Sequence, residues 1–188
     1  MKSLWITKIF PYDGTQLRPL FAYLSEGLLG DSIVSWRGPC QIDWVNMVDG
    51  EDLRAQSPIA GSDMVHFIVE KFDCSLFAAV GLQRLITAIA LELIRDLAKE
   101  GSLALQVFRV GDDLFCGERK LSISVATLSL RSALIHFALN VSNEGTPVPT
   151  LSLTDLGIDP EQFSRILLDR VVEEVHSVIE ATCKVRTV

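Results

Sequence analysis

The sequence predicts an α+β fold in which a central, mainly antiparallel sheet is flanked by helices. Two apolar, alternating segments at 119–128 and 133–142 are joined by a short link, so antiparallel pairing is expected. An unbroken apolar stripe at three- and four-residue steps predicts a long helix over residues 77–99. Because strands and helices do not alternate regularly along the chain, a parallel βαβ arrangement is not expected.

The composition is typical of one globular domain. The chain has 188 residues, enough for one sizeable core, so we expect a single domain over residues 1–188. Hydrophobic residues make up 48% and charged residues 22%, which argues against extensive disorder. The formal net charge is -7, and nucleic-acid binding usually requires a basic surface, so a nucleic-acid partner is not expected.

Cysteine usage and hydropathy predict a cytoplasmic protein. The four cysteines form no CxxC pair and no metal-ligand spacing, so no metal site is expected and a reducing compartment is favoured. The first residues lack the apolar run of a signal peptide. Since no stretch approaches about 18 uninterrupted apolar residues, no membrane association is expected.

The first half of the chain is expected to contain three strands and one short helix. Pro19 is expected in the first turn of that helix, where its missing N–H does little harm. The next strand is expected to leave regular structure at Pro39. The predicted elements are a strand at 4–9, a helix from 17 to the glycines at 27 and 30, a strand at 33–36, an acidic loop at 43–62 and a strand at 64–72.

The second half begins with the main core helix, 77–99, which Gly101 ends. Gln83 and Thr87 fall outside its apolar stripe. A strand at 103–110 and a turn at 111–113 precede the strands at 119–128 and 133–142. The last helix begins with Asp159 as N-cap and Pro160 at the first helical position, with Gln162 near a capping-box position.

The strand at 119–128 has an unusual distribution of side chains. One face carries Leu121, Ile123 and Val125, which we expect to be in a core, and the other carries Lys120, Ser122, Ser124 and Ala126. A solvent-facing side usually has long polar residues, whereas this side has one cation followed by small residues. The pattern therefore indicates a pocket wall with one fixed positive charge.

The strand at 133–142 supplies a matching face. If the hairpin turn centres near Leu130, Lys120 lies opposite Asn140 and Ser124 opposite His136, with Ser122 opposite Ala138. A ligand-lining face and an ordinary solvated sheet face both alternate in this way, so both interpretations stay open.

Other residues are weaker candidates. Arg37 followed by Gly38 could bind an anion, because Gly admits a ligand close to the backbone and Arg grips carboxylates or phosphates with two hydrogen bonds. His66 and His136 are each more typical of structural histidines. Asp112 and Asp113 are typical of a solvated turn. With these weaker candidates included, the candidate catalytic residues are Lys120 and Cys40. The candidate ligand-binding residues are Arg37, Gly38, His66, Asp113, Ser122, Ser124, His136 and Asn140.

Residues 111–122 (GDDLFCGERKLS) resemble the lysine motif of biotin and lipoate protein ligases, and 137–143 (FALNVSN) resemble the strand that follows it. Arg37-Gly38 occupies the place of the ligase substrate loop. Over nearly its whole length, the chain resembles an uncharacterised prokaryotic family of unknown function, on segments 30–40, 63–67 and 120–143. That family is placed in the class II aminoacyl-tRNA synthetase and biotin–lipoate ligase fold.

The resemblance implies an enzyme that activates or transfers a small carboxylate or acyl group. Lys120 would then bind the substrate carboxylate and the activating phosphate, and ATP and magnesium would be the cofactors of an adenylate-forming reaction. An ATP-free version would carry the acyl group as a thioester on Cys40 or Cys116. Because the substrate loop here has one glycine and a proline, a non-catalytic module for a nucleotide or small anion is the alternative. A homodimer is expected.

Overall fold

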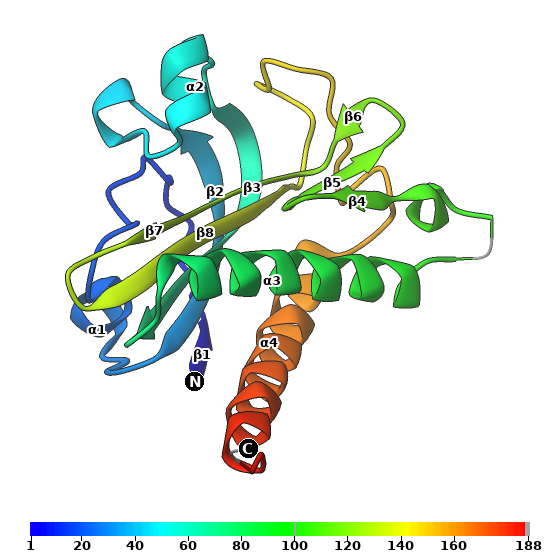
Figure 1. The fold of residues 1–188 in the computed structure, drawn as a ribbon. Coiled ribbons are helices and arrows are strands. Elements are labelled where there is room, and N and C mark those ends of the chain that lie inside the picture. Colours follow the sequence, from blue (N-terminus) through cyan, green and yellow to red (C-terminus); the bar gives the residue numbers. More distant parts are fainter. Residues whose placement is uncertain (100, 187–188) are drawn as a thin grey trace.

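A five-stranded sheet forms the centre of the protein (Figure 1). The computed structural model describes residues 1–99 and 101–186, so residues 100, 187 and 188 of the expected domain lie outside the described residues. The strand order is β1-β2-β3-β8-β7, in which β1 pairs parallel to β2 and the other pairs are antiparallel. The predicted α+β class with a mainly antiparallel sheet is confirmed. The strands are β1 (Lys2–Trp5), β2 (Ser32–Gln41), β3 (Ala60–Phe72), β7 (Ser122–Leu128) and β8 (Ser132–Asn140).

Two long helices cover one face of this sheet (Figure 1). Helix α3 (Leu76–Asp96) packs on β7 and β8, and α4 (Pro160–Cys183) packs on β1, β2 and α3. The expected cap is present, because the Asp159 carboxylate accepts a 2.7 Å hydrogen bond from the Gln162 backbone N–H. We call the apolar layer between sheet and helices the helix-side core; its buried members include Val65, Phe67, Ile86, Phe137 and Leu167.

Helix α3 is long and apolar enough to cross a membrane by length and composition. Its buried residues pack on the sheet, with 44% of the apolar window buried, as in the core helix of a globular domain.

Irregular segments and short helices cover the opposite face. Residues 6–28, which include α1 (Phe21–Glu26), contribute to a second apolar cluster around Trp36 and Ile68, which we call the loop-side core. Farther along this face lies the segment 42–59, with η1 (Trp44–Asn46) and α2 (Gly50–Ala55), at the top of Figure 1. These two helical turns lie within the predicted acidic loop.

A small sheet of three short strands lies beside the main one. It consists of β4 (Phe108–Val110), β5 (Asp113–Cys116) and β6 (Arg119–Lys120) in that order. The predicted strand at 103–110 is wrong in its first half, because η2 (Leu103–Gln106) precedes β4. The predicted strand at 119–128 is divided into β6 and β7, which belong to different sheets.

Strand β2 continues past Pro39, where we expected it to end. The pairing of β2 with β3 shifts between Gly38 and Cys40, so Pro39 lies at an irregularity where its missing N–H leaves no ladder position unpaired. The Pro39 carbonyl is also used, since it accepts a 2.8 Å hydrogen bond from the Tyr12 backbone N–H. The chain at Tyr12 therefore pairs with the part of β2 that the sequence predicted to leave regular structure.

The faces predicted for β7 are wrong. Ser122 pairs with Leu139 and Ser124 with Phe137, one residue away from the predicted register, so both serines lie on the helix side. The cause is Leu121, which lies between the two sheets. Leu121 and Ser122 are both fully buried, and Leu121 is part of the helix-side core, so the alternation of sides fails at this step.

Candidate functional site

A cavity of about 260 Å³ lies on the loop side of β7 and β8. Ile123 and Val125 line it from β7, and Met64 lines it from β3. The opposite wall comes from the segment that contains η1 and α2, and from the loop at 146–150. Because a one-residue difference in register reverses a strand's faces, the wall from β7 is mainly apolar, with Ser124 at its border. The cavity is therefore suited to an apolar body.

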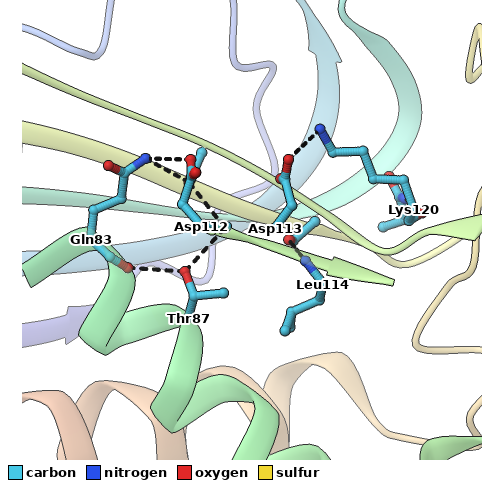
Figure 2. Close-up of polar contacts among 9 residues, drawn as sticks. Gln83, Thr87, Asp112, Asp113, Leu114 and Lys120 are labelled. Atoms are coloured by element: carbon cyan, nitrogen blue, oxygen red, sulfur yellow. Dashed lines mark hydrogen bonds and ion pairs between the residues drawn. The ribbon is translucent and has the colours of Figure 1, made fainter. Parts of the chain in front are cut away.

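Lys120 and Asp113 form the charged end of this site. The Lys120 Nζ lies 2.7 Å from the Asp113 Oδ2, and both side chains are half-buried (Figure 2). Neighbouring strands place them, since Lys120 in β6 pairs with Phe115 in β5, the strand that Asp113 begins. Lys120 is the only Lys or Arg in the cavity lining among the described residues. The predicted single cation is present, and it already has a carboxylate partner.

A polar network anchored on α3 holds the aspartate turn in place (Figure 2). The Gln83 amide donates to the Asp112 carboxylate over 2.7 Å and to the Ser124 hydroxyl over 2.8 Å, and Thr87 donates to the Asp112 carbonyl over 3.1 Å. Asp112 is thus turned toward α3 while Asp113 meets Lys120. The Ser124 hydroxyl donates to the Asp112 carboxylate, so although Ser124 borders the cavity its polar atom is used elsewhere.

Sequence reasoning missed this network. It placed Gln83 and Thr87 outside the apolar stripe, yet both are buried on α3. Two polar residues four positions apart, adjoining an apolar stripe, were the available signal, because buried polar side chains require partners. Asp112 is consequently not the solvated turn residue that its turn propensity indicated.

Carboxylates outnumber cations around the cavity. Asp49 and Asp52 line the wall opposite the sheet, and Asp113 lies at the Lys120 end. Burial raises the pKa of Asp113 although Lys120 opposes the shift. Burial and the nearby Asp49 raise the pKa of Asp52. The electrostatics therefore disfavour a ligand with several negative charges.

Asn140 and Ser122 have structural hydrogen bonds. The Asn140 amide donates to the carbonyls of Lys120 and Leu151, each over 3.2 Å, and the Ser122 hydroxyl accepts from the Leu114 N–H over 2.9 Å. Asn140 borders the cavity, as predicted, and its amide hydrogens hold the backbone of Lys120. It therefore positions the lysine.

His66 and His136 form a buried pair beside the cavity. The His66 Nδ1 and His136 Nε2 are 3.2 Å apart, and the His66 Nε2 is 3.1 Å from the Gly38 carbonyl oxygen. Burial lowers the pKa of His66 to about 4 and lowers that of His136 well below its usual value. The Tyr12 ring stacks on His136 with centroids 3.7 Å apart, and His136 borders the cavity.

Arg37 and Gly38 do not line the cavity. Arg37 binds Asp63 through two hydrogen bonds, the one from its Nε being 2.8 Å long. A side chain at Gly38 would overlap the Phe10 carbonyl oxygen, so this glycine admits the protein's own chain. The space beside Gly38 that the sequence suggested for a ligand is filled by the backbone of Phe10.

The cysteines are poorly placed for catalysis. Cys40 is 2% exposed in the loop-side core, and burial raises the pKa of its thiol to about 12. Because a thiolate is the reactive form, a buried thiol with a raised pKa is poorly suited to act as a nucleophile at neutral pH. Cys116 is buried in the helix-side core. Within residues 1–99 and 101–186, no group of three metal-ligating side chains occurs.

The fold is that of the biotin and lipoate protein ligases. A biotin protein ligase from Aquifex aeolicus superimposes with a TM-score of 0.59 at 14% identity, covering 96% of this chain and 71% of that one. A lipoate-protein ligase A bound with ATP superimposes with a TM-score of 0.55 at 14% identity, covering 93% and 85%. At this identity the likeness establishes the fold alone.

The chain belongs to the family described as Domain of unknown function (DUF366), whose model matches residues 1–186. A protein of unknown function from Pyrococcus horikoshi has 41% identity and a TM-score of 0.92, covering 99% of this chain and 98% of that one. An uncharacterized protein of Methanocaldococcus jannaschii is 32% identical over 181 residues, which are 93% of this chain and 76% of that protein.

Proposed function

We propose that this protein binds a small carboxylate with an apolar body in the cavity beside β7 and β8. The observation that carries the proposal is the position of Lys120, a half-buried cation at one end of a largely apolar cavity. The apolar part of the ligand would lie along Ile123 and Val125, and its carboxylate would share Lys120 with Asp113. The resemblance to the lysine motif of the ligases gives Lys120 the same role.

The balance of charge favours a binding module over an adenylate-forming enzyme. Adenylate formation brings a carboxylate and a triphosphate together, and fixed cations are needed to stabilise that charge. Here Lys120 is paired with Asp113, and Asp49 and Asp52 add negative charge to the wall. One monoanionic ligand fits this arrangement better than two anionic substrates.

An enzyme that activates carboxylates is the second candidate. Asp49 and Asp52 line the same wall of the cavity. Magnesium binds carboxylate oxygens together with ATP phosphates, so these two residues would be its protein ligands in an ATP-dependent reaction. The thioester version has less support, because Cys40 and Cys116 are buried. Carboxylate-dependent exchange of pyrophosphate into ATP would favour the enzyme, and binding without exchange would favour the module.

Calorimetric titration with octanoate tests the proposal directly. Lys120→Ala removes a hydrogen bond to a charged group, so we expect octanoate affinity to fall by about tenfold or more. Lys71→Ala is the matched control, because Lys71 forms a similarly half-buried ion pair with Asp31 at 2.9 Å outside the cavity lining. Equal affinity in wild type and Lys120→Ala, or a complete absence of binding to the wild type at millimolar octanoate, would contradict the proposal.

A further inference from the structure

The His66–His136 pair has one hydrogen-bonding arrangement when both rings are neutral. The Gly38 carbonyl oxygen can only accept, so the His66 Nε2 must carry the proton that it donates. The His66 Nδ1 is then bare and accepts from the His136 Nε2, which must also be protonated. The His136 Nδ1 is therefore left without a proton, as a hydrogen-bond acceptor.

This acceptor has no partner among the described residues. Within the described ranges, no hydrogen bond reaches the His136 Nδ1, although His136 as a whole is only 2% exposed. The His136 Nδ1 is not among the described side-chain nitrogens and oxygens that are both unpartnered and fully sealed, so part of its small surface stays accessible. His136 borders the cavity, and the Tyr12 ring stacked on it covers a face of the imidazole rather than its edge.

We propose that the His136 Nδ1 accepts a hydrogen bond from the ligand, and that it selects carboxylates with an O–H or N–H group at their apolar end. This inference rests on the proposed function and names its ligand class more closely. The spacing suits such a molecule, because His136 and Asn140 lie on the same side of β8, four residues or about 13 Å apart, and Asn140 holds Lys120. Ala138 lies between them, so no large side chain from β8 divides the cavity.

Charge supports an acceptor over a cationic contact at this position. Burial keeps both histidines neutral at physiological pH, and His136 faces His66 and the Tyr12 ring. No described Asp or Glu hydrogen-bonds either imidazole, and Lys120, the cation of the lining, is paired with Asp113. The unprotonated His136 Nδ1 needs a hydrogen-bond donor, and the ligand would supply it.

The protonation pattern can be tested without a ligand. Long-range proton–nitrogen NMR correlations on protein labelled with ¹⁵N-histidine distinguish the two tautomers of each ring. We expect His66 and His136 both to be protonated at Nε2 and bare at Nδ1 at pH 7. A His136 ring protonated at Nδ1 would overturn the inference.

Ligand selection can be tested with 8-hydroxyoctanoate and 8-methoxyoctanoate, since the hydroxyl donates whereas the methyl ether accepts only. We expect wild type to bind the hydroxy acid about fivefold more tightly, the value of one neutral hydrogen bond. In His136→Phe, which keeps a flat ring beside Tyr12, the ratio should fall to about 1. His176→Phe, at an exposed position on α4, is the control and should retain the wild-type ratio.

The outcomes separate this inference from the proposed function. Equal binding of both acids to wild type, with affinity still lost in Lys120→Ala, would overturn the role of His136 and leave the carboxylate site standing. If wild type binds neither acid, the proposed function fails, and with it the ligand selectivity inferred here. The wild-type comparison requires no variant, so an unstable His136→Phe protein would not prevent a decision.

Discussion

At the scale of single residues, the histidine pair connects the fold to pH. Both imidazoles are buried and neutral in the folded protein, whereas unfolded histidines titrate near pH 6.5. The unfolded state therefore binds more protons below pH 6.5, and the stability that the pair contributes above that pH is lost as the pH falls toward 4. Above pH 7 these histidines are neutral in both states, so they cause no pH dependence of the free energy of unfolding.

We expect the free energy of unfolding to fall by roughly 2 kcal/mol between pH 7 and pH 5.5, about half from each histidine. His66→Gln should lose about half as much over this range, because its amide can still donate to the Gly38 carbonyl but does not titrate. Urea unfolding at a series of pH values measures both slopes. Identical slopes for wild type and variant would show that His66 is not neutralised by burial.

Gly38 is a second residue whose identity is fixed by packing. A Cβ at this position would overlap the Phe10 carbonyl oxygen, which is backbone and cannot rotate away. We expect Gly38→Ala to destabilise the protein by about 1–3 kcal/mol. Gly81→Ala is the control, because Gly81 lies in α3, where an added Cβ would enter open space and alanine favours the helix. Urea midpoints should therefore move in opposite directions.

At the scale of elements, α3 fixes the position of the strand that holds Asp113. Gln83→Leu would remove the amide that binds Asp112 and Ser124, and leave a half-buried carboxylate short of a donor. We expect a loss of about 1–3 kcal/mol in stability. Amide hydrogen exchange should quicken along β5, while Glu92→Leu, on the exposed side of α3, should leave β5 unchanged. Unchanged exchange in Gln83→Leu would contradict this role.

Several predictions that rest on local pattern succeeded, although the helix expected from residue 17 begins only at Phe21, after Pro19. The stripe of α3, the Asp159 cap and the β7–β8 hairpin all depend on residues close together in sequence, and all are present. The faces of β7 were wrong because alternation was carried through Leu121, where the chain passes from one sheet to another. The alternation of apolar and polar residues along the sequence does not show where a strand leaves one sheet and enters another.

At the scale of the whole molecule, the fold class and the ligase-like architecture were predictable, whereas the partners of the charged residues were not. Arg37 and Asp63 are 26 positions apart, and Gly38 and Phe10 are 28 apart, so contacts through folded space determine what each can do. Lys120 lines the cavity, as predicted, but the sequence did not predict its ion pair with Asp113. The expected homodimer stays a prediction.

The pairing of Lys120 with Asp113 has a consequence for any carboxylate that enters the cavity. A second anion beside Lys120 would weaken the hold of that cation on Asp113, whose pKa burial already raises. A weaker contact with Lys120 raises the pKa of Asp113 further, so ligand binding favours proton uptake by Asp113 and affinity should increase toward acid pH. In calorimetry, the heat of binding should consequently vary with the ionisation enthalpy of the buffer. Each proton that Asp113 takes up would offset part of the negative charge that the ligand brings into the site.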